Sequence, residues 1–255
     1  MLQQVKEQQD TFEEIYSKDN AARFYFNVTN DPLLRYLRDR RLQKALDFIK
    51  AKSGGEDIYQ WKILVVCGGV GGEGIFFIRK GFYDVTVSDI SENSLQICRE
   101  LEPEIKTMVL NGEDTGLPEN AFDLVIVQDG LHHLPRPTTG FTEMLRTARK
   151  GVIVIEPYQS TVGNLIGTEW EVHGGSTNYV YRWNRMMVEQ AVKSYLLKDY
   201  KTIRVFRFWD HNVVIRKLAL KFPKSMQLRI AKTVYALLEL IRFSGNMMVA
   251  VVLKN

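Results

Sequence analysis

Two adjacent histidines, His132 and His133, are the side chains in this sequence best suited to proton transfer. An imidazole changes its charge near neutral pH, so it can act as a general base or acid. Neighbouring residues at the start of a helix cannot share one face. We therefore expect one ring to point into a site and the other into the protein. A structural role for both rings is the alternative.

A cluster of glycines between Cys67 and Gly74 follows directly after the short apolar run 63–66. Glycine tolerates positive φ and lets the backbone approach a ligand closely. A buried strand, a tight glycine turn and a helix form the nucleotide-binding opening of a doubly wound α/β domain. Asp89 ends the next predicted strand, 18 residues after Gly71. An acid at about this distance is expected to hold ribose hydroxyls.

Polar residues follow five consecutive predicted strands, at residues 63–66, 83–88, 105–110, 121–127 and 151–155. These polar residues are the glycine turn, Asp89, the segment 111–114, Gln128 with Asp129, and Glu156. Open α/β sheets bind ligands at the carboxyl ends of their strands. The sequence therefore predicts one site along this edge of the sheet.

The remaining segments are expected to frame the sheet. Residues 1–60 have a helical, aromatic-rich pattern and are predicted to form a cap beside the ligand mouth, where Tyr16 or Tyr25 either closes over a cofactor or packs in the core. Residues 61–255 form the main domain, with insertions near 158–200 and 211–245. Two further strands are predicted at 201–209 and 246–253, the last one antiparallel.

The glycine turn also matches G-x-G-x-x-G from Gly69 to Gly74, so an NAD-dependent oxidoreductase is an alternative. Three features oppose it: the motif begins after some sixty residues, Leu-His-His-Leu follows the fourth strand, and the chain closes with a strand after a long excursion. A seven-stranded, mostly parallel sheet accounts better for this arrangement.

Residues 62–157 resemble the class I S-adenosyl-L-methionine-dependent methyltransferases. The matching parts are the glycine turn, the Asp89 strand end, Asn-Gly-Glu-Asp at 111–114, Leu-Pro-Glu-Asn-Ala-Phe-Asp at 117–123, Leu-His-His-Leu-Pro at 131–135 and Val-Ile-Val-Ile-Glu-Pro at 152–157. The resemblance implies a doubly wound, Rossmann-like α/β fold and S-adenosyl-L-methionine as cofactor. It places cofactor contacts at Cys67, Gly69, Gly71, Asp89, Ile90, Asn111, Gly112, Glu113, Gln128 and Asp129.

The same resemblance suggests the chemistry. In similar sugar and small-molecule O-methyltransferases a histidine pair and an acid after the fifth strand form the base, which here implies His132, His133 and Glu156. The chain departs from the family pattern at Val65, where an acid is usual, and at Cys67, where a glycine is usual. Water or a cap residue such as Arg23 is expected to replace the missing acid. A non-catalytic cofactor-binding protein is the remaining alternative.

The composition of the chain argues against several other classes of protein. The 255 residues are 45% hydrophobic, enough for one large core, and the net charge of +4 is too small to indicate nucleic acid. The two cysteines show neither a disulfide framework nor a metal-ligand spacing, so we expect no metal and a reducing cytoplasm. The first residues contain no apolar signal core, and no run is long enough to span a membrane without charges.

The C-terminal segment is strongly basic. Residues 201–255 contain eleven Lys or Arg against Asp210 and Glu239. The helical pattern at 226–243 is unusually apolar for a surface helix. A helix packed on the domain or in a homodimer would explain this pattern. The alternative is a surface for a membrane or for an anionic or lipid-linked small-molecule acceptor. The aromatic residues are not spaced as a stacking platform, so nucleic acid is not expected.

Overall fold

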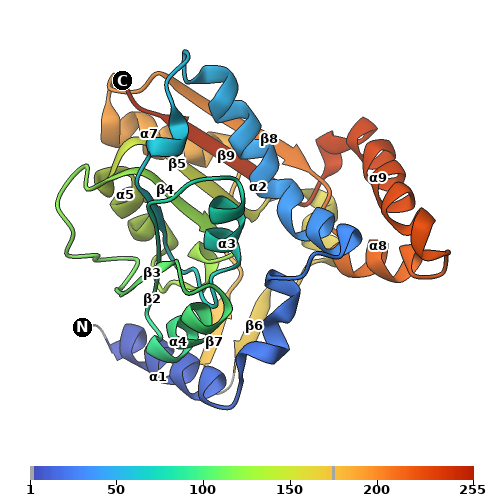
Figure 1. Cartoon of the computed structure of the whole chain (residues 1–255). Coiled ribbons are helices and arrows are strands. Elements are labelled where there is room, and N and C mark those ends of the chain that lie inside the picture. Colours follow the sequence, from blue (N-terminus) through green and yellow to red (C-terminus); the bar gives the residue numbers. More distant parts are fainter. Residues whose placement is uncertain (1–2, 174–175) are drawn as a thin grey trace.

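The computed structural model describes residues 3–173 and 176–255 (Figure 1). Its centre is a seven-stranded sheet with the order β3-β2-β1-β4-β5-β9-β8. The strands are β1 (Ile63–Val65), β2 (Val85–Asp89), β3 (Lys106–Val109), β4 (Phe122–Gln128), β5 (Ala148–Pro157), β8 (Thr202–Phe208) and β9 (Met247–Leu253). β9 is antiparallel to both of its neighbours, and the pairs among β1 to β5 are parallel. The predicted doubly wound sheet with an antiparallel last strand is confirmed.

Helices cover both faces of this sheet. The helices are α1 (Gln3–Ser17), α2 (Pro32–Lys52), α3 (Gly72–Arg79), α4 (Glu92–Leu101), α5 (Pro137–Thr147), α6 (Thr161–Ile166), α7 (Arg185–Leu196), α8 (Asn212–Ala219) and α9 (Lys224–Leu240). Short 3-10 turns occur at η1 (Ala21–Asn27), η2 (Ile58–Gln60), η3 (Leu131–His133) and η4 (Arg242–Ser244). Residues of α2, α3 and α4 pack in one core cluster, and residues of α5 and α7 pack in the other.

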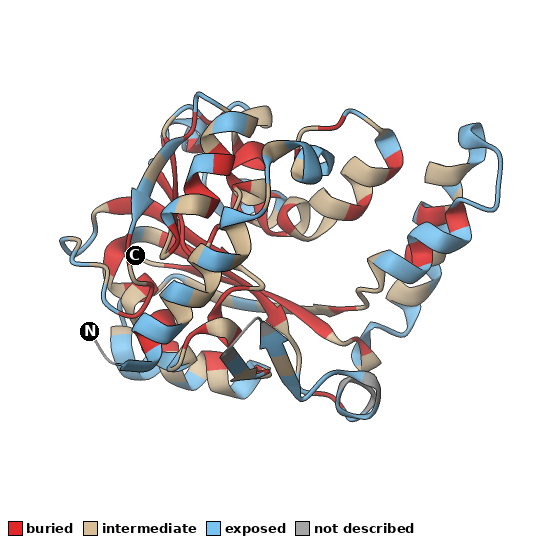
Figure 2. Cartoon of the chain, turned by 90° about the horizontal axis from the view of Figure 1, so that it is seen from below, coloured by how far each residue is buried: buried red, intermediate tan, exposed pale blue. Residues whose placement is uncertain are grey.

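The strands alternate between these two clusters. Ile63 and Val65 of β1 belong to the cluster beneath α2 and α3, whereas Leu64 belongs to the cluster beneath α5. All three side chains are fully buried. Because side chains of a strand point to opposite faces in turn, a strand covered on both sides must be apolar throughout. Figure 2 shows the strands of the sheet mostly as buried. The same requirement explains why Val65, which is fully buried in the inner strand β1, fits at its position.

The N-terminal segment divides into two parts with different roles. Leu42, Ala45, Leu46 and Ile49 of α2 lie in the main core, so α2 is a layer of the α/β sandwich and differs from the expected cap. α1 and η1 instead contact α4, and α1 also contacts the strand β7 (Ser176–Tyr179). The carboxylate of Glu13 in α1 accepts hydrogen bonds from backbone amides at the start of α4. This contact fixes α1 across the carboxyl ends of the strands.

The segment after β5 combines an excursion with a structural helix. β6 (Trp170–His173) and β7 (Ser176–Tyr179) form a separate two-stranded hairpin. α7 follows, and its Val188 and Val192 are fully buried in the second core cluster. The expected insertion at 158–200 is therefore partly a covering layer of the sheet.

The basic C-terminal segment, where an insertion was expected near 211–245, forms the two helices α8 and α9. α8 ends at Ala219, and Pro223 precedes α9, so the chain reverses between them. Proline fixes φ and cannot donate the backbone hydrogen bond that a continuing helix needs. Ile215, Ala219, Ala231 and Tyr235 pack with the first turns of α2 in a separate small core. This pair of helices, the C-terminal hairpin, projects from the body of the molecule (Figure 1). Among the described residues, no helix is long and apolar enough to cross a membrane.

Candidate functional site

The turn between β1 and α3 holds its backbone in conformations that glycine favours. Gly69 has φ 49° and Gly71 has φ 86°, and Cys67 between β1 and these glycines has φ 52°. A Cβ added at Gly71 would lie 2.3 Å from Cys98 Sγ, so this glycine allows α4 to approach the turn. Cys67 stands where the family pattern has glycine, and its positive φ gives the physical reason for that preference.

Asp89 links this turn to the end of β2. Its Oδ2 accepts a hydrogen bond of 2.8 Å from the Gly69 amide, and its Oδ1 accepts one of 3.0 Å from Ser91. Burial raises the pKa of Asp89, although the backbone hydrogen bonds oppose that change. The carboxylate is therefore held in place by the backbone at the carboxyl edge of the sheet.

A first cavity of about 160 Å³, the Asp89 cavity, lies at this edge. Its wall contains seven of the ten predicted cofactor contacts, together with side chains of α1 and η3. The residues lining it are Gln8, Phe12, Tyr16, Cys67, Gly69, Asp89, Ile90, Leu110, Asn111, Gly112, Asp129, Gly130, His133 and Leu134. The structure thus brings together residues from the ends of β1, β2, β3 and β4.

A second cavity of about 550 Å³, the Glu73 cavity, lies on the other side of the glycine turn. Its walls come from α1, η1, α2, the glycine turn, α3, the end of β4 and α8. The residues lining it are Tyr16, Phe26, Asn27, Leu34, Leu37, Arg38, Arg41, Cys67, Gly68, Gly69, Val70, Gly72, Glu73, Gln128, Asn212, Val213, Arg216, Lys217 and Leu220. Tyr16, Cys67 and Gly69 line both cavities. The two spaces therefore meet at these three residues.

Glu73 is the titratable group whose environment stands out in the second cavity. Burial raises its pKa to about 7, helped by the Asp129 carboxylate, while Arg41 and a hydrogen bond from Gln128 oppose the rise. Gln128 Nε2 donates to Glu73 Oε1 over 2.7 Å. Our sequence analysis did not identify Glu73. Glu73 belongs to the first turn of α3, and its place among the glycines of residues 67–74 was the available signal.

Arg41 of α2 adds a fixed positive charge to the same wall. Its guanidinium lies 2.6 Å from an Asp129 oxygen and 3.1 Å from an Asp210 oxygen. The two carboxylates outweigh the effect of burial and raise the pKa of Arg41. Sequence reasoning missed Arg41, because its partners lie 88 and 169 positions away along the chain. Only the packing of α2 on the sheet brings it here.

Only one of the three residues predicted to form the base lines either cavity. His132 and Glu156 line neither the Asp89 cavity nor the Glu73 cavity. His132 Nδ1 instead lies 2.7 Å from Glu156 Oε2, and both side chains are buried. Glu156 Oε1 also accepts hydrogen bonds from the amides of Gly130 and Leu131. This pair therefore holds the turn after β4 in place.

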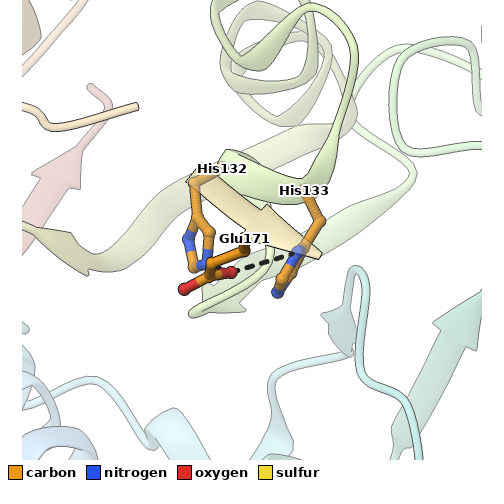
Figure 3. A group of neighbouring side chains, drawn as sticks. All are labelled: His132, His133 and Glu171. Carbon is orange, nitrogen blue, oxygen red and sulfur yellow. Dashed lines mark ion pairs between the residues drawn. The ribbon is translucent and has the colours of Figure 1, made fainter. Parts of the chain in front are cut away.

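The imidazoles of His132 and His133 lie side by side, with their ring centroids 4.2 Å apart, although only His133 lines the Asp89 cavity. Burial lowers the pKa of His132, but hydrogen bonds with Glu156 and Glu171 outweigh it and raise the pKa to about 10. His133 lines the Asp89 cavity and contacts the Phe12 ring of α1 edge-on. Glu171 of the β6–β7 hairpin lies between the two imidazoles (Figure 3).

Several other predicted residues have roles outside the cavity walls. Glu113 is buried and accepts hydrogen bonds from Arg136, including one of 3.0 Å from Nε, so it anchors the loop after β3 and lines neither cavity. Arg23 pairs with Asp19 and lies outside both cavity walls, so it does not replace the missing acid at Val65. Tyr25 is 63% exposed, whereas Tyr16 lies at the junction of the cavities.

Comparisons with known proteins agree with this architecture. Residues 65–155 match the family model described as a methyltransferase domain. No curated protein matches the sequence. A solved structure from Galdieria sulphuraria, assigned as a sarcosine dimethylglycine methyltransferase, superposes with a TM-score of 0.59 at 16% identity, covering 93% of this chain and 99% of that one.

Two further structures are similar at the same level. Magnesium protoporphyrin IX methyltransferase from Synechocystis, solved with S-adenosylhomocysteine, gives a TM-score of 0.54 at 12% identity over 87% of this chain and 85% of that one. Phosphoethanolamine N-methyltransferase 2 from Haemonchus contortus gives 0.51 at 15% identity over 82% and 52%. At these identities the structural likeness supports the fold alone.

Proposed function

Since this chain is a class I S-adenosyl-L-methionine-dependent methyltransferase with its methyltransferase domain at residues 65–155, we propose that it methylates a hydroxyl oxygen of an anionic small molecule. A hydroxyl of a sugar or glycan that also carries a negative group fits this description. The observation that carries the proposal is the Glu73 cavity, which joins a carboxylate of raised pKa to a cationic wall.

The residues present fit the cofactor. Gln128 Oε1 is buried without a hydrogen-bond partner among the described residues, and Gln128 lines the Glu73 cavity. A carbonyl oxygen in this state suits an ammonium group such as that of the cofactor's amino-acid end. Arg41 would meet its carboxylate, and Asp89 would accept from its ribose hydroxyls. Gln128 and Arg41 line the Glu73 cavity, and Asp89 lines the Asp89 cavity. The cofactor would therefore cross the junction where the two cavities meet.

Glu73 is proposed as the general base. S-adenosyl-L-methionine supplies a methyl group that its sulfonium already makes electrophilic. A hydroxyl must lose its proton to become a strong nucleophile, and a base with a pKa near the working pH removes it most effectively. The pKa of Glu73 is raised to about 7, and its side chain lines the Glu73 cavity. Gln128 holds one of its oxygens, leaving the other to take the proton.

The cationic wall would select the acceptor. Arg216 and Lys217 of α8 line the Glu73 cavity, and neither has a partner among the described residues. Arg38 lines it as well, but its guanidinium already contacts Asp39 and the Asn27 carbonyl. Cations without partners raise the local concentration of anions. An acceptor bearing phosphate or carboxylate is therefore favoured over a neutral one.

The histidines have a secondary role in this proposal. His132 and Glu156 would hold the turn after β4, next to Asp129. His133 lines the Asp89 cavity and remains the alternative candidate for the general base. The reaction therefore depends first on Glu73, and His133 becomes the base only if Glu73 proves dispensable.

Methyl transfer to a matched set of acceptors tests the proposal. The set should share one scaffold and vary one group at a time: hydroxyl or amine at the reacting position, and phosphate, carboxylate or a neutral group at the far end. Mass spectrometry identifies the product. We expect methyl ethers from the anionic hydroxyl compounds. Transfer confined to amines, or to neutral acceptors, would overturn the proposal.

The C-terminal hairpin supports a second proposal, contact with an anionic membrane surface. Val213, Leu237, Leu240 and Phe243 are each at least 60% exposed, and the segment 216–232 adds six cations. Exposed apolar side chains beside cations suit the interface of an anionic bilayer. Flotation with anionic, but not neutral, liposomes is expected. A concentration-dependent homodimer without liposome binding would assign the same surface to self-association.

The two free cysteines, Cys67 and Cys98, fit the proposal that the protein works in the reducing cytoplasm.

A further inference from the structure

Three potential metal ligands meet beside the turn after β4. His132 Nε2 lies 3.7 Å from Glu171 Oε2, and His133 Nδ1 lies 3.9 Å from the same oxygen. One ligand atom from each residue falls within 4.8 Å of the other two. Figure 3 shows both imidazoles facing the Glu171 carboxylate, which comes from β6. The expectation of no metal rested on sequence spacing, and Glu171 is 38 positions beyond His133.

The surroundings hold two of these ligands in position. Glu156 binds the Nδ1 side of His132 at 2.7 Å, which leaves Nε2 directed toward Glu171. Glu156 is itself fixed by two backbone amides and is fully buried. Histidine ligands of metals nearly always make such a contact with a carboxylate through their other nitrogen. Asn178 of β7 donates to the His132 carbonyl over 3.1 Å, which fixes the hairpin to the same turn.

We propose that His132, His133 and Glu171 bind a divalent transition-metal ion, best represented by Zn²⁺. Two imidazoles and one carboxylate form a donor set that suits zinc and leaves a coordination position open. A magnesium or calcium ion would prefer oxygen ligands. The carboxylates of Glu156 and Glu171 balance the charge of a dication.

The observed spacing requires only a small adjustment. Ligand atoms at zinc-bond lengths of about 2.0–2.2 Å in a tetrahedral site lie roughly 3.4 Å apart. The two His–Glu171 pairs, at 3.7 and 3.9 Å, need to close by a few tenths of an ångström, and the two imidazole ligand atoms lie within 4.8 Å of each other. Glu171 belongs to the β6–β7 hairpin, which is not part of the seven-stranded sheet, so it can make this movement. The β6–β7 hairpin covers the turn after β4, and the ion would join the two elements.

The open position would face a third space. His133 lines the Asp89 cavity and also a cavity of about 590 Å³ between α1 and the β6–β7 hairpin. Tyr179 and Tyr181 line this third cavity as well. A water molecule or an oxygen of a ligand in that space could complete the coordination. The site is distinct from the Glu73 cavity, where acceptor binding is proposed. Failure of one proposal therefore leaves the other intact.

Metal titration of the full-length, metal-free protein without cofactor tests the inference. Calorimetry with Zn²⁺ and absorption spectroscopy with Co²⁺ should both show one ion per chain, with a Co²⁺ spectrum lacking a thiolate charge-transfer band. Removing an outer-shell partner costs about 10–100-fold in metal affinity, so loss of a ligand should cost at least ~100-fold. Glu171→Gln and His133→Ala should both show this loss. Glu169→Gln, next to the hairpin and outside the cluster, is the matched control.

Other outcomes would overturn the inference. One is the absence of stoichiometric binding in the wild type. Another is binding that Glu171→Gln and His133→Ala leave unchanged while circular dichroism shows both variants folded. A thiolate band in the Co²⁺ spectrum would assign the ion to Cys67 or Cys98. Because His132 also supports the turn, its replacement is unsuitable as the main test, and the two chosen variants avoid that problem.

Discussion

The Asp89 cavity and the Glu73 cavity meet at the same glycine turn, yet they are assembled in different ways. The first is built largely from the ends of β1 to β4, within residues 67–134, with α1 laid across it. The second takes most of its walls from α2, α3 and α8, and its lining residues span positions 16 to 220. The proposed nucleoside side is thus formed locally by the sheet, whereas the proposed acceptor side depends on distant helices packing together.

The two cavities also differ in the chemical groups that line them. The Asp89 cavity relies on backbone amides and on the half-buried carboxylate of Asp89, which a parallel sheet places at its carboxyl edge. The Glu73 cavity relies on charged side chains, namely Glu73, Arg41 and Arg216. A common fold can therefore keep its cofactor end constant while helices around the other end select the acceptor.

Replacing Glu73 with Gln should give the largest effect and test the acceptor side directly. Loss of a general base is expected to lower kcat by ~10²–10⁴-fold while affinity for S-adenosylhomocysteine barely changes. With its pKa raised to about 7, the wild-type carboxylate is ionised above that pH and protonated below it. Wild-type kcat should therefore rise with pH through about 7, and the variant should lose this rise. Steady-state kinetics from pH 5.5 to 8.5 measure it.

Two comparisons sharpen this result. Glu104 is an exposed acid after α4, and Glu104→Gln should leave both kcat and the affinity for S-adenosylhomocysteine unchanged. If Glu73→Gln weakens S-adenosylhomocysteine binding and preserves kcat, then Glu73 holds the cofactor's ammonium group and the base lies elsewhere. His133→Ala would then be the next variant to examine.

Gly71→Ala tests the shared turn, on which both cavities depend. The new Cβ meets Cys98 Sγ at 2.3 Å and the backbone has a positive φ of 86°. Overpacking costs about 1–3 kcal/mol and the left-handed conformation roughly 1–2 kcal/mol, so the free energy of unfolding should fall by ~2–5 kcal/mol. Urea denaturation measures this loss. Gly54→Ala, with φ 67° and open space around it, should lose only the conformational part, and an equal loss for both would refute the packing argument.

Asp89→Ala tests the cofactor side alone. Removing a carboxylate that accepts charge-assisted hydrogen bonds should weaken S-adenosylhomocysteine binding by ~1–3 kcal/mol. Calorimetry gives this value, with Asp84→Asn as the control, because Asp84 pairs with Lys106 away from both cavity walls. Unchanged affinity in the Asp89 variant would mean that the nucleoside binds elsewhere.

The double change of Arg216 and Lys217 to Gln should give the smallest effect and probe the acceptor side again. Exposed charge pairs contribute about 0.2–1 kcal/mol each, so loss of both cations should raise KM for an anionic acceptor by ~2–30-fold. Its salt dependence should also flatten, because fewer cations attract the anion. Binding of S-adenosylhomocysteine should stay the same. Lys221 and Lys224 do not line the cavity, so their replacement should leave KM unchanged, and an equal effect would indicate only a diffuse field.

Much of the architecture was predictable because its signals are local. The strand alternation, the glycine turn and Asp89 fix the parallel sheet and its ligand edge within a short stretch of chain. Errors arose where packing between distant segments decided the outcome. The amphipathic pattern of α2 could not distinguish a cap from a sheet layer, and only the buried contacts of Leu46 and Ile49 with the sheet resolve this.

The candidate site divides along the same line. Seven of the predicted cofactor contacts line the Asp89 cavity, because consecutive strands of a parallel sheet bring their ends together. Glu113 failed this expectation, since its side chain turns to Arg136, and the residue order gives no sign of that partner. Glu156 likewise ends the predicted strand but faces His132 and the backbone inside the protein.

The sequence by itself determined the α/β class, the glycine turn, the Asp89 carboxylate and the basic character of the C-terminal segment. The tertiary structure alone decided that Glu73 acquires a pKa of about 7, that Arg41 meets Asp129, that Arg216 faces a cavity and that Glu171 meets two imidazoles. The reason is physical: strand and turn preferences act between near neighbours, whereas burial and charge pairing depend on residues that only folding brings within a few ångströms.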